Sequence, residues 1–183
     1  MKIRVALASA LAVGLLSSCA STPNVAGSAF VIGDERVPQS EVTKLVREAT
    51  TQLRGYPPVV TNNQPTTAEL SATIVSRLLQ HQIFLLVSES DPRFKVTPVQ
   101  VKRTREVLET QYGTDVVEQQ LVLTNGAPKS QIDNFVYDIA LSQLVSKILV
   151  PKGSDVEKQN AFSAYIKKIT AKNPIRVSPR YGA

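Results

Sequence analysis

Residues 68–89 read AELSATIVSRLLQHQIFLLVSE, and they predict the helix on which the rest of the fold packs. The second half of this stretch, Ile83–Val87, is apolar on nearly all sides, which is typical of a helix at the centre of a domain. Thr66 or Thr67 is expected to cap the helix, and Glu69 lies favourably in its first turn. The residues that follow one another at helical spacing are Leu70, Ile74, Leu78, His81 and Leu85.

Further helices are predicted on both sides of this stretch from apolar spacing and from residues that start or end helices. Before it, Ser40 is expected to cap a helix that runs to about Arg54, and residues 55–66 are predicted to form a loop because prolines and asparagines recur there. After it, the predicted helices are Thr97–Tyr112, ended by Gly113, then Asp115–Leu123, then Lys129–Val150, and a last helix that starts at Ser154 and ends before Asn173-Pro174.

Short β-prone runs lie at the two ends of this helical region. Ala29–Ile32 and Arg36–Val37 flank the turn residues Gly33-Asp34, and Ile175–Val177 follows the last predicted helix. Neither run makes a stable sheet alone, so pairing between them would join the two ends of the domain. The alternative is that both runs are extended loops. The predicted fold class is therefore mainly α, a multi-helix domain with a small β element that pairs the N- and C-terminal ends.

The N-terminus has the layout of an export signal. Lys2 and Arg4 form a basic head, and the uncharged run Val5–Leu16 follows. A run of about a dozen residues is too short to cross a hydrocarbon core of roughly 30 Å, which needs about 20 residues. Residues 1–18 are therefore predicted to be a cleaved signal peptide.

The residues at the predicted cleavage point resemble the bacterial lipobox. In Leu16-Ser17-Ser18-Cys19, cleavage before Cys19 would leave this cysteine as the first mature residue and the site of lipid attachment. Each buried methylene of an acyl chain contributes about 0.8 kcal/mol, so two or more chains anchor a protein firmly. The expected location is the extracytoplasmic face of a bacterial membrane, and the sequence leaves open which membrane that is. The alternative is an incidental thiol in an ordinary secretory signal.

Composition sets further limits on organisation and partners. Residues 19–28, small and polar with Pro23 and Gly27, are predicted to be a flexible lipidated tether, and residues 29–183 a single domain. Loss of Lys2 and Arg4 lowers the net charge from +6 by two, and so mild an excess with no basic run argues against nucleic-acid binding. With one cysteine in the chain, the domain is expected to depend on its packed core instead of disulfides.

Candidate catalytic and metal-binding residues are few. His81 is the only histidine, so no metal site or Ser-His-Asp grouping can be argued around it, and it is predicted to lie at the core edge with a local hydrogen bond. Asp34 and Glu35 are adjacent at the tip of a turn, where neighbouring side chains point apart. Aspartate is common in turns, so Asp34 is expected there for its turn chemistry and not for paired-carboxylate catalysis. No glycine loop that could cradle phosphates is present, so no nucleotide or other cofactor is expected.

Two surface questions remain open in the sequence. Lys102, Arg103 and Arg105 form a basic cluster that is expected to be a solvated helix face, and the alternative is docking to anionic lipid or cell-wall polymer. The apolar run Ile83–Val87 is expected to be core, although any cleft that binds other proteins would have to use residues of this kind.

Three stretches together resemble the SurA N-terminal domain family. They are Ala29–Val37 followed by Ser40-Glu41-Val42, then Gly113–Leu144 with the turn Gly126-Ala127-Pro128, and the ending Val177–Gly182. The resemblance covers most of residues 29–182 and lies in the order of the elements. Members are exported chaperones or foldases, many with parvulin-type prolyl isomerase domains. Such a domain needs roughly a hundred further residues and a pair of histidines, and this chain has one histidine, so isomerase activity is predicted to be absent and no enzyme is expected.

The resemblance implies an ATP-independent, chaperone-like lipoprotein that binds unfolded or newly exported proteins in an apolar helical cleft. Burial of apolar surface has no preferred direction, so such a cleft tolerates many client sequences. The alternative is a structural or adaptor lipoprotein that binds one dedicated envelope partner. A broad apolar cleft would favour the chaperone, and a flatter, more specific patch would favour the adaptor.

Overall fold

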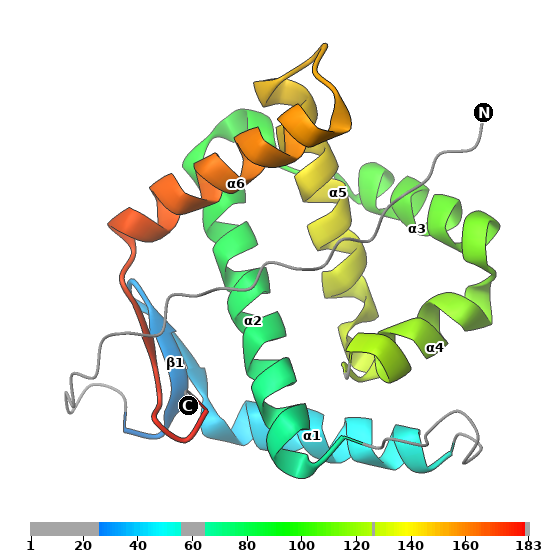
Figure 1. The fold of residues 1–183 in the computed structure, drawn as a ribbon, viewed down its shortest axis with the longest axis vertical. Helices are drawn as coiled ribbons and strands as arrows, with labels where there is room; N and C mark the ends of the chain where they lie inside the picture. The colour runs from blue at the N-terminus through cyan, green and yellow to red at the C-terminus, as the bar shows by residue number, and fades with distance from the viewer. Residues whose placement is uncertain (1–25, 56–64, 126, 182–183) are drawn as a thin grey trace.

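The computed structural model describes residues 26–55, 65–125 and 127–181, and of residues 120–125 the backbone only. These residues form a mainly helical domain with a small antiparallel sheet at one side (Figure 1). In chain order the elements are β1 (Ser28–Ile32), β2 (Glu35–Pro38), α1 (Gln39–Arg54), α2 (Thr67–Ser90), the 3₁₀ helix η3 (Pro92–Phe94), α3 (Pro98–Tyr112), α4 (Thr114–Asn125), the 3₁₀ helix η4 (Lys129–Gln131), α5 (Ile132–Leu149), α6 (Asp155–Lys172) and β3 (Ile175–Val177). The predicted fold class is confirmed.

Helix α2 is the central element, as its sequence predicts. It contacts α1, α5, α6, β1 and η3 (Figure 1). Its N-terminus is closed by a capping box: the Thr66 hydroxyl accepts from the Glu69 amide at 3.2 Å, and the Glu69 carboxylate accepts from the Thr66 amide at 2.7 Å. By length and composition alone α2 could also cross a membrane, but the central helix of a domain meets the same criteria.

The sheet joins the two ends of the domain. Its strand order is β2-β1-β3, and Phe30 in the middle strand faces Val37 on one side and Val177 on the other. Gly33 makes the tight turn between β1 and β2 with a φ of 56°, and its amide donates to the Pro174 carbonyl at 3.3 Å. The predicted pairing of the N- and C-terminal runs is therefore correct, and the alternative of two extended loops is not.

The start of α1 differs from the sequence prediction. Ser40 does not cap this helix, because the helix begins at Gln39 directly after β2, and Pro38 takes the cap position without a side-chain hydrogen bond. The Gln39 amide instead donates to the Gly27 carbonyl at 3.0 Å. The chain segment before β1 thus supplies an acceptor for one of the first-turn amides that have no partner within the helix.

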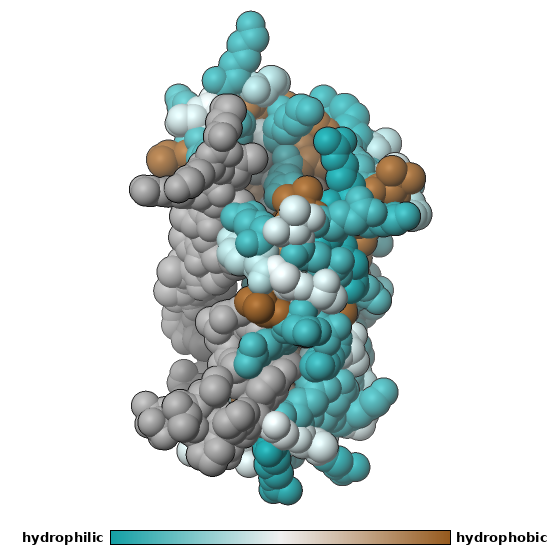
Figure 2. Space-filling model, turned by 90° about the vertical axis from the view of Figure 1, so that its right-hand side faces the viewer, coloured by the Kyte–Doolittle hydropathy of each residue, from teal (hydrophilic) through white to brown (hydrophobic). Residues whose placement is uncertain are grey.

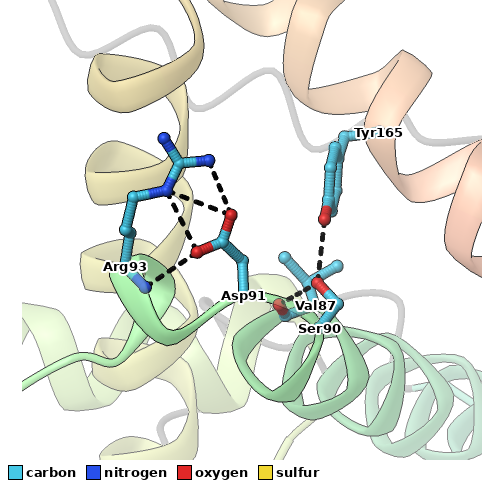
Figure 3. Close-up of polar contacts among 5 residues, drawn as sticks. All are labelled: Val87, Ser90, Asp91, Arg93 and Tyr165. Atoms are coloured by element: carbon cyan, nitrogen blue, oxygen red, sulfur yellow. Dashed lines mark hydrogen bonds and ion pairs between the residues drawn. The ribbon is translucent and has the colours of Figure 1, made fainter.

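A compact junction connects the end of α2 to α6 (Figure 3). The Ser90 hydroxyl donates to the Val87 carbonyl at 2.6 Å and lies 2.9 Å from the Tyr165 hydroxyl on α6. Asp91 accepts from the Arg93 amide at 2.9 Å and pairs with its guanidinium, and these hydrogen bonds hold the pKa of the Asp91 carboxyl below its usual range. The junction fixes the turn from which the chain leaves toward α3.

The apolar interior is divided into two clusters of very different size. The main core draws residues from β1, β2, α1, α2, η3, α5 and α6, and no described side chain of α3 or α4 belongs to it. A second, smaller set joins α3 and α4 to α5; we call it the arm cluster, and α3 with α4 the arm. The arm cluster consists of buried Leu108, Val117 and Val136 with the partly buried Val101, Tyr112, Ile132 and Ile139. The remaining elements are called the body.

Candidate functional site

The arm is a helical hairpin with well-defined local signals. Thr97 caps α3: its hydroxyl accepts from the Gln100 amide at 3.3 Å, while the Gln100 side chain accepts from the Thr97 amide at 2.7 Å. Gly113 ends α3 with a φ of 86°, a conformation that favours glycine, and α4 follows at once. The arm lies across α5 from α2, on the side away from the sheet (Figure 1).

Polar contacts between the arm and the body are exposed to solvent. Arg105 on α3 pairs with Asp133 on α5, whose side chain is 83% exposed. Lys129 in η4 pairs with Glu118 on α4 at 2.9 Å, with both side chains at least one-third exposed. Exposed pairs of this kind contribute only about 0.2–1 kcal/mol each and are screened by salt.

The segment that follows the arm is hydrogen-bonded to α1. The Glu48 carboxylate accepts from the Ser130 amide at 3.2 Å and from its hydroxyl at 2.8 Å. The Gln52 side-chain oxygen accepts from the Lys129 amide at 3.0 Å. Because η4 is hydrogen-bonded to α1 in this way and η3 places Phe94 in the main core, both ends of the arm are attached to the body.

The outer face of α3 exposes two valines, Val99 at 75% and Val107 at 52%. Beside Val107 lies an open depression of about 400 Å³, which is lined by Arg103, Glu106, Val107, Thr110 and Gln111. This side of the molecule is mainly hydrophilic, with small, separate hydrophobic spots (Figure 2). On this face, the described residues therefore form no broad apolar cleft.

Two of the three residues of the predicted basic cluster on α3, Lys102 and Arg105, lie close to carboxylates. Lys102 lies 3.9 Å from Glu106, and Arg105 pairs with Asp133 and lies 3.9 Å from Glu109. These contacts support the interpretation as a solvated helix face more than a docking site for anionic lipid.

A histidine and an aspartate meet between α2 and α5. His81 Nδ1 lies 2.7 Å from Asp138 Oδ1, and the two side chains are 14% and 13% exposed. Burial raises the pKa of the Asp138 carboxyl, against the lowering effects of the His81 hydrogen bond and the nearby charges of His81 and Arg77. The predicted position of His81 at the core edge is correct, but the predicted local hydrogen bond is wrong, since its partner is 57 residues away on another helix.

The His81–Asp138 pair is best explained as a link between helices. A histidine and an aspartate become catalytic only beside a nucleophile or a substrate pocket. The depression on α3 and a second one of about 270 Å³, lined by Asp115, Glu118, Gln119 and Lys129, both lie elsewhere. Within the described ranges no group of three histidine, cysteine or acidic residues could hold a metal ion. Sequence reasoning missed Asp138, although a carboxylate in the middle of an apolar helix is itself a signal of a buried partner.

Two further predictions concern the N-terminal part of the chain. Asp34 lies in the turn between β1 and β2, as expected, and Glu35 begins β2. Cys19, the signal peptide and the tether up to residue 25 lie outside the described residues, so lipid attachment stays a prediction. Strand β1 already begins at Ser28, one residue before the predicted start of the domain.

Comparison of the chain with protein-family models and with curated proteins finds no match. The resemblance to the SurA N-terminal domain family therefore stays a prediction.

Proposed function

We propose that this chain is a lipid-anchored lipoprotein on the extracytoplasmic face of a bacterial membrane, and that its helical domain binds unfolded or newly exported proteins without ATP. The observation that carries the proposal is the separate arm cluster. Leu108 and Val117 pack with Val136 outside the main core, so local opening of the arm would uncover aliphatic surface while the main core stays packed. Such surface would bind client segments by non-directional apolar burial.

The position of the predicted anchor is consistent with this role. Cys19 precedes Ser28 by nine positions, a length of chain that spans at most about 30 Å. Both β1 and β3 lie in the sheet, and the arm lies on the other side of α2 and α5 (Figure 1). An anchor at Cys19 would therefore keep the sheet near the membrane and leave the arm accessible to proteins farther away.

Aggregation of an unfolded protein tests the client-binding proposal. A fluorescently labelled, chemically unfolded exported protein is diluted into buffer with the full chain in lipid nanodiscs, or with empty nanodiscs, and the pelleted label is measured. We expect less pelleted label with the full chain and no effect of added ATP. Equal pelleting in both samples would contradict the proposal.

An adaptor role is the second candidate, and it is favoured by the shape of the described surface. The depression beside Val107 is small and has polar as well as apolar lining residues, which suits one dedicated envelope partner better than many clients. A photo-crosslinker placed at Thr110 in cells distinguishes the two roles. One dominant crosslinked band supports the adaptor, and a broad smear of products supports the chaperone.

The anchor is tested separately from the binding activity. The Cys19→Ser variant is expected to leave the membrane fraction, because it lacks the thiol that carries the acyl chains. Wild-type and variant proteins are compared by sedimentation of membranes after high-salt washing. A variant that still sediments with membranes would remove the support for lipid attachment.

The proposal includes no enzymatic activity, nucleotide or nucleic-acid partner. The single histidine, His81, is paired with Asp138, whereas the parvulin pocket of the family that the chain resembles uses two histidines. Acceleration of prolyl isomerisation in a model peptide by the full chain would contradict this part of the proposal.

A further inference from the structure

We propose that the arm opens away from α5, and α4 away from its contact with α1, while the body stays folded, and that the strip uncovered on α5 binds an extended aliphatic segment of a client. The strip consists of Ile132, Val136 and Ile139, which follow one another at four- and three-residue spacing on one face of the helix. The client part of this inference rests on the proposed function, whereas the opening of the arm does not.

The first argument is the separation of the arm's described buried side chains from the main core. Leu108 and Val117 are buried in the arm cluster, and no described side chain of α3 or α4 belongs to the main core. The free energy of closing scales with the apolar area removed from water, at about 25 cal/mol per Å². An element whose buried side chains lie outside the main core can open at a free energy below that of global unfolding.

The second argument is the kind of polar contact that supports closure. The Arg105–Asp133 and Lys129–Glu118 pairs lie at the rim, where water and ions reach them. The exposed pairs contribute little and lose strength as salt rises. Salt therefore weakens the polar part of arm closure, while the junctions at η3 and η4 keep the opened arm attached.

The third argument concerns the occupant of the strip. In the closed structure the strip is covered by Leu108 and Val117, so it already binds leucine and valine side chains. A client segment with aliphatic side chains has the same chemistry and competes with the arm for the same surface. Because the client binds only the open state, its apparent affinity is reduced by the fraction of molecules that are open.

Amide hydrogen exchange of the full chain in lipid nanodiscs tests the opening. We expect the α3 and α4 amides to exchange faster than the α2 amides at low salt, and the arm amides alone to exchange faster still in molar salt. The Asp133→Asn variant removes the rim pair and should raise arm exchange about twofold to fivefold at low salt. Asp155→Asn on α6, which removes an exposed carboxylate of another pair, is the control and should leave arm exchange unchanged.

Equal exchange of the arm and α2 under all conditions would overturn the inference, because the arm would then open only when the whole domain unfolds. If the arm amides exchange at the same rate in Asp133→Asn as in the wild type, the rim pairs do not contribute to closure and the second argument is wrong.

Binding of a labelled, permanently unfolded aliphatic-rich polypeptide tests the occupant. We expect Asp133→Asn to raise the affinity by the same factor as it raises arm exchange, and Asp155→Asn to leave it unchanged. If the wild-type chain binds the probe but Asp133→Asn has no effect, the proposed function stands and the strip is the wrong site. If the arm opens but neither protein binds the probe, the client-binding function fails and the opening stands.

Discussion

Two valines on the same helix show how differently the body and the arm are built. Val136 and Val145 both lie on α5, and both are 0% exposed. Val145 belongs to the main core, whereas Val136 belongs to the arm cluster with Leu108 and Val117. Equal burial therefore does not mean equal importance for global stability. The effect of a buried side chain on global stability depends on whether its neighbours can separate from it while the rest of the domain stays folded.

The largest expected effect lies in the body. Phe30 is fully buried in the middle strand, between Val37 and Val177. Phe30→Ala should lower the free energy of unfolding by about 3–5 kcal/mol, because it leaves a cavity where the two ends of the domain meet. Denaturant unfolding measures this value. Val156→Ala, at a valine that is 67% exposed, is the control and should change stability by less than about 0.5 kcal/mol.

The two valines of α5 provide a direct test of the comparison. Each Val→Ala change should destabilise its cluster by about 2 kcal/mol. Val145→Ala should lower the free energy that protects the α2 amides from exchange and leave the opening free energy of the arm unchanged. Val136→Ala should lower the opening free energy of the arm. If Val145→Ala lowers arm and α2 protection equally, the arm and the body form one cooperative unit.

Helix caps extend the same test to smaller energies. Thr97 caps α3 in the arm and Ser154 caps α6 in the body, and both form complete capping boxes. Each change to alanine should cost about 1 kcal/mol. Thr97→Ala should increase exchange in α3 most, and Ser154→Ala should lower the protection of the body without weakening arm closure. A loss of arm protection in Ser154→Ala would contradict the division into two regions.

The smallest expected effect is a pH dependence between α2 and α5. Burial raises the pKa of Asp138, so the folded state binds this proton more tightly than the unfolded state. The resulting contribution to stability is fully present below the unfolded pKa of about 3.9, and it is lost as pH rises through the raised folded pKa. Asp138→Asn should remove this dependence. The free energy of unfolding of the wild-type and Asp138→Asn proteins is measured at a series of pH values from below about 3.9 upward. The same pH dependence in both proteins would contradict the assignment of this effect to Asp138.

Much of the fold could be predicted from local signals in the sequence. The central helix, the proline start of α3 after Thr97 and the end at Gly113 all agree with the structure, and of the two threonines proposed as the cap of the central helix it is Thr66 that caps it. These signals depend on hydrogen bonds and spacing within a few residues, which explains their success. Ser40 failed as a cap because the acceptor for the first amide of α1 comes from Gly27, which the helix pattern does not reveal.

The candidate site was less predictable than the fold. The sequence pointed to basic residues on α3 and to an apolar run on α2, yet Arg105 is bound in the rim pair with Asp133, and Ile83, Phe84 and Val87 belong to the main core. The arm cluster brings together residues of α3, α4 and α5, and no short motif marks such a set. Likewise, His81 could be placed at the core edge, but its partner Asp138 could not be identified.

The sequence by itself determined which regions form helices, most of the points where those helices start and end, and that short strands at opposite ends of the domain could pair. Only the tertiary structure decided that α5 divides its faces between two apolar clusters and that no described side chain of α3 or α4 joins the main core. The physical reason is the separation along the chain over which each kind of interaction acts. Capping and periodicity act between residues a few positions apart, whereas the allocation of side chains to one core or another is set by packing between helices far apart in the chain.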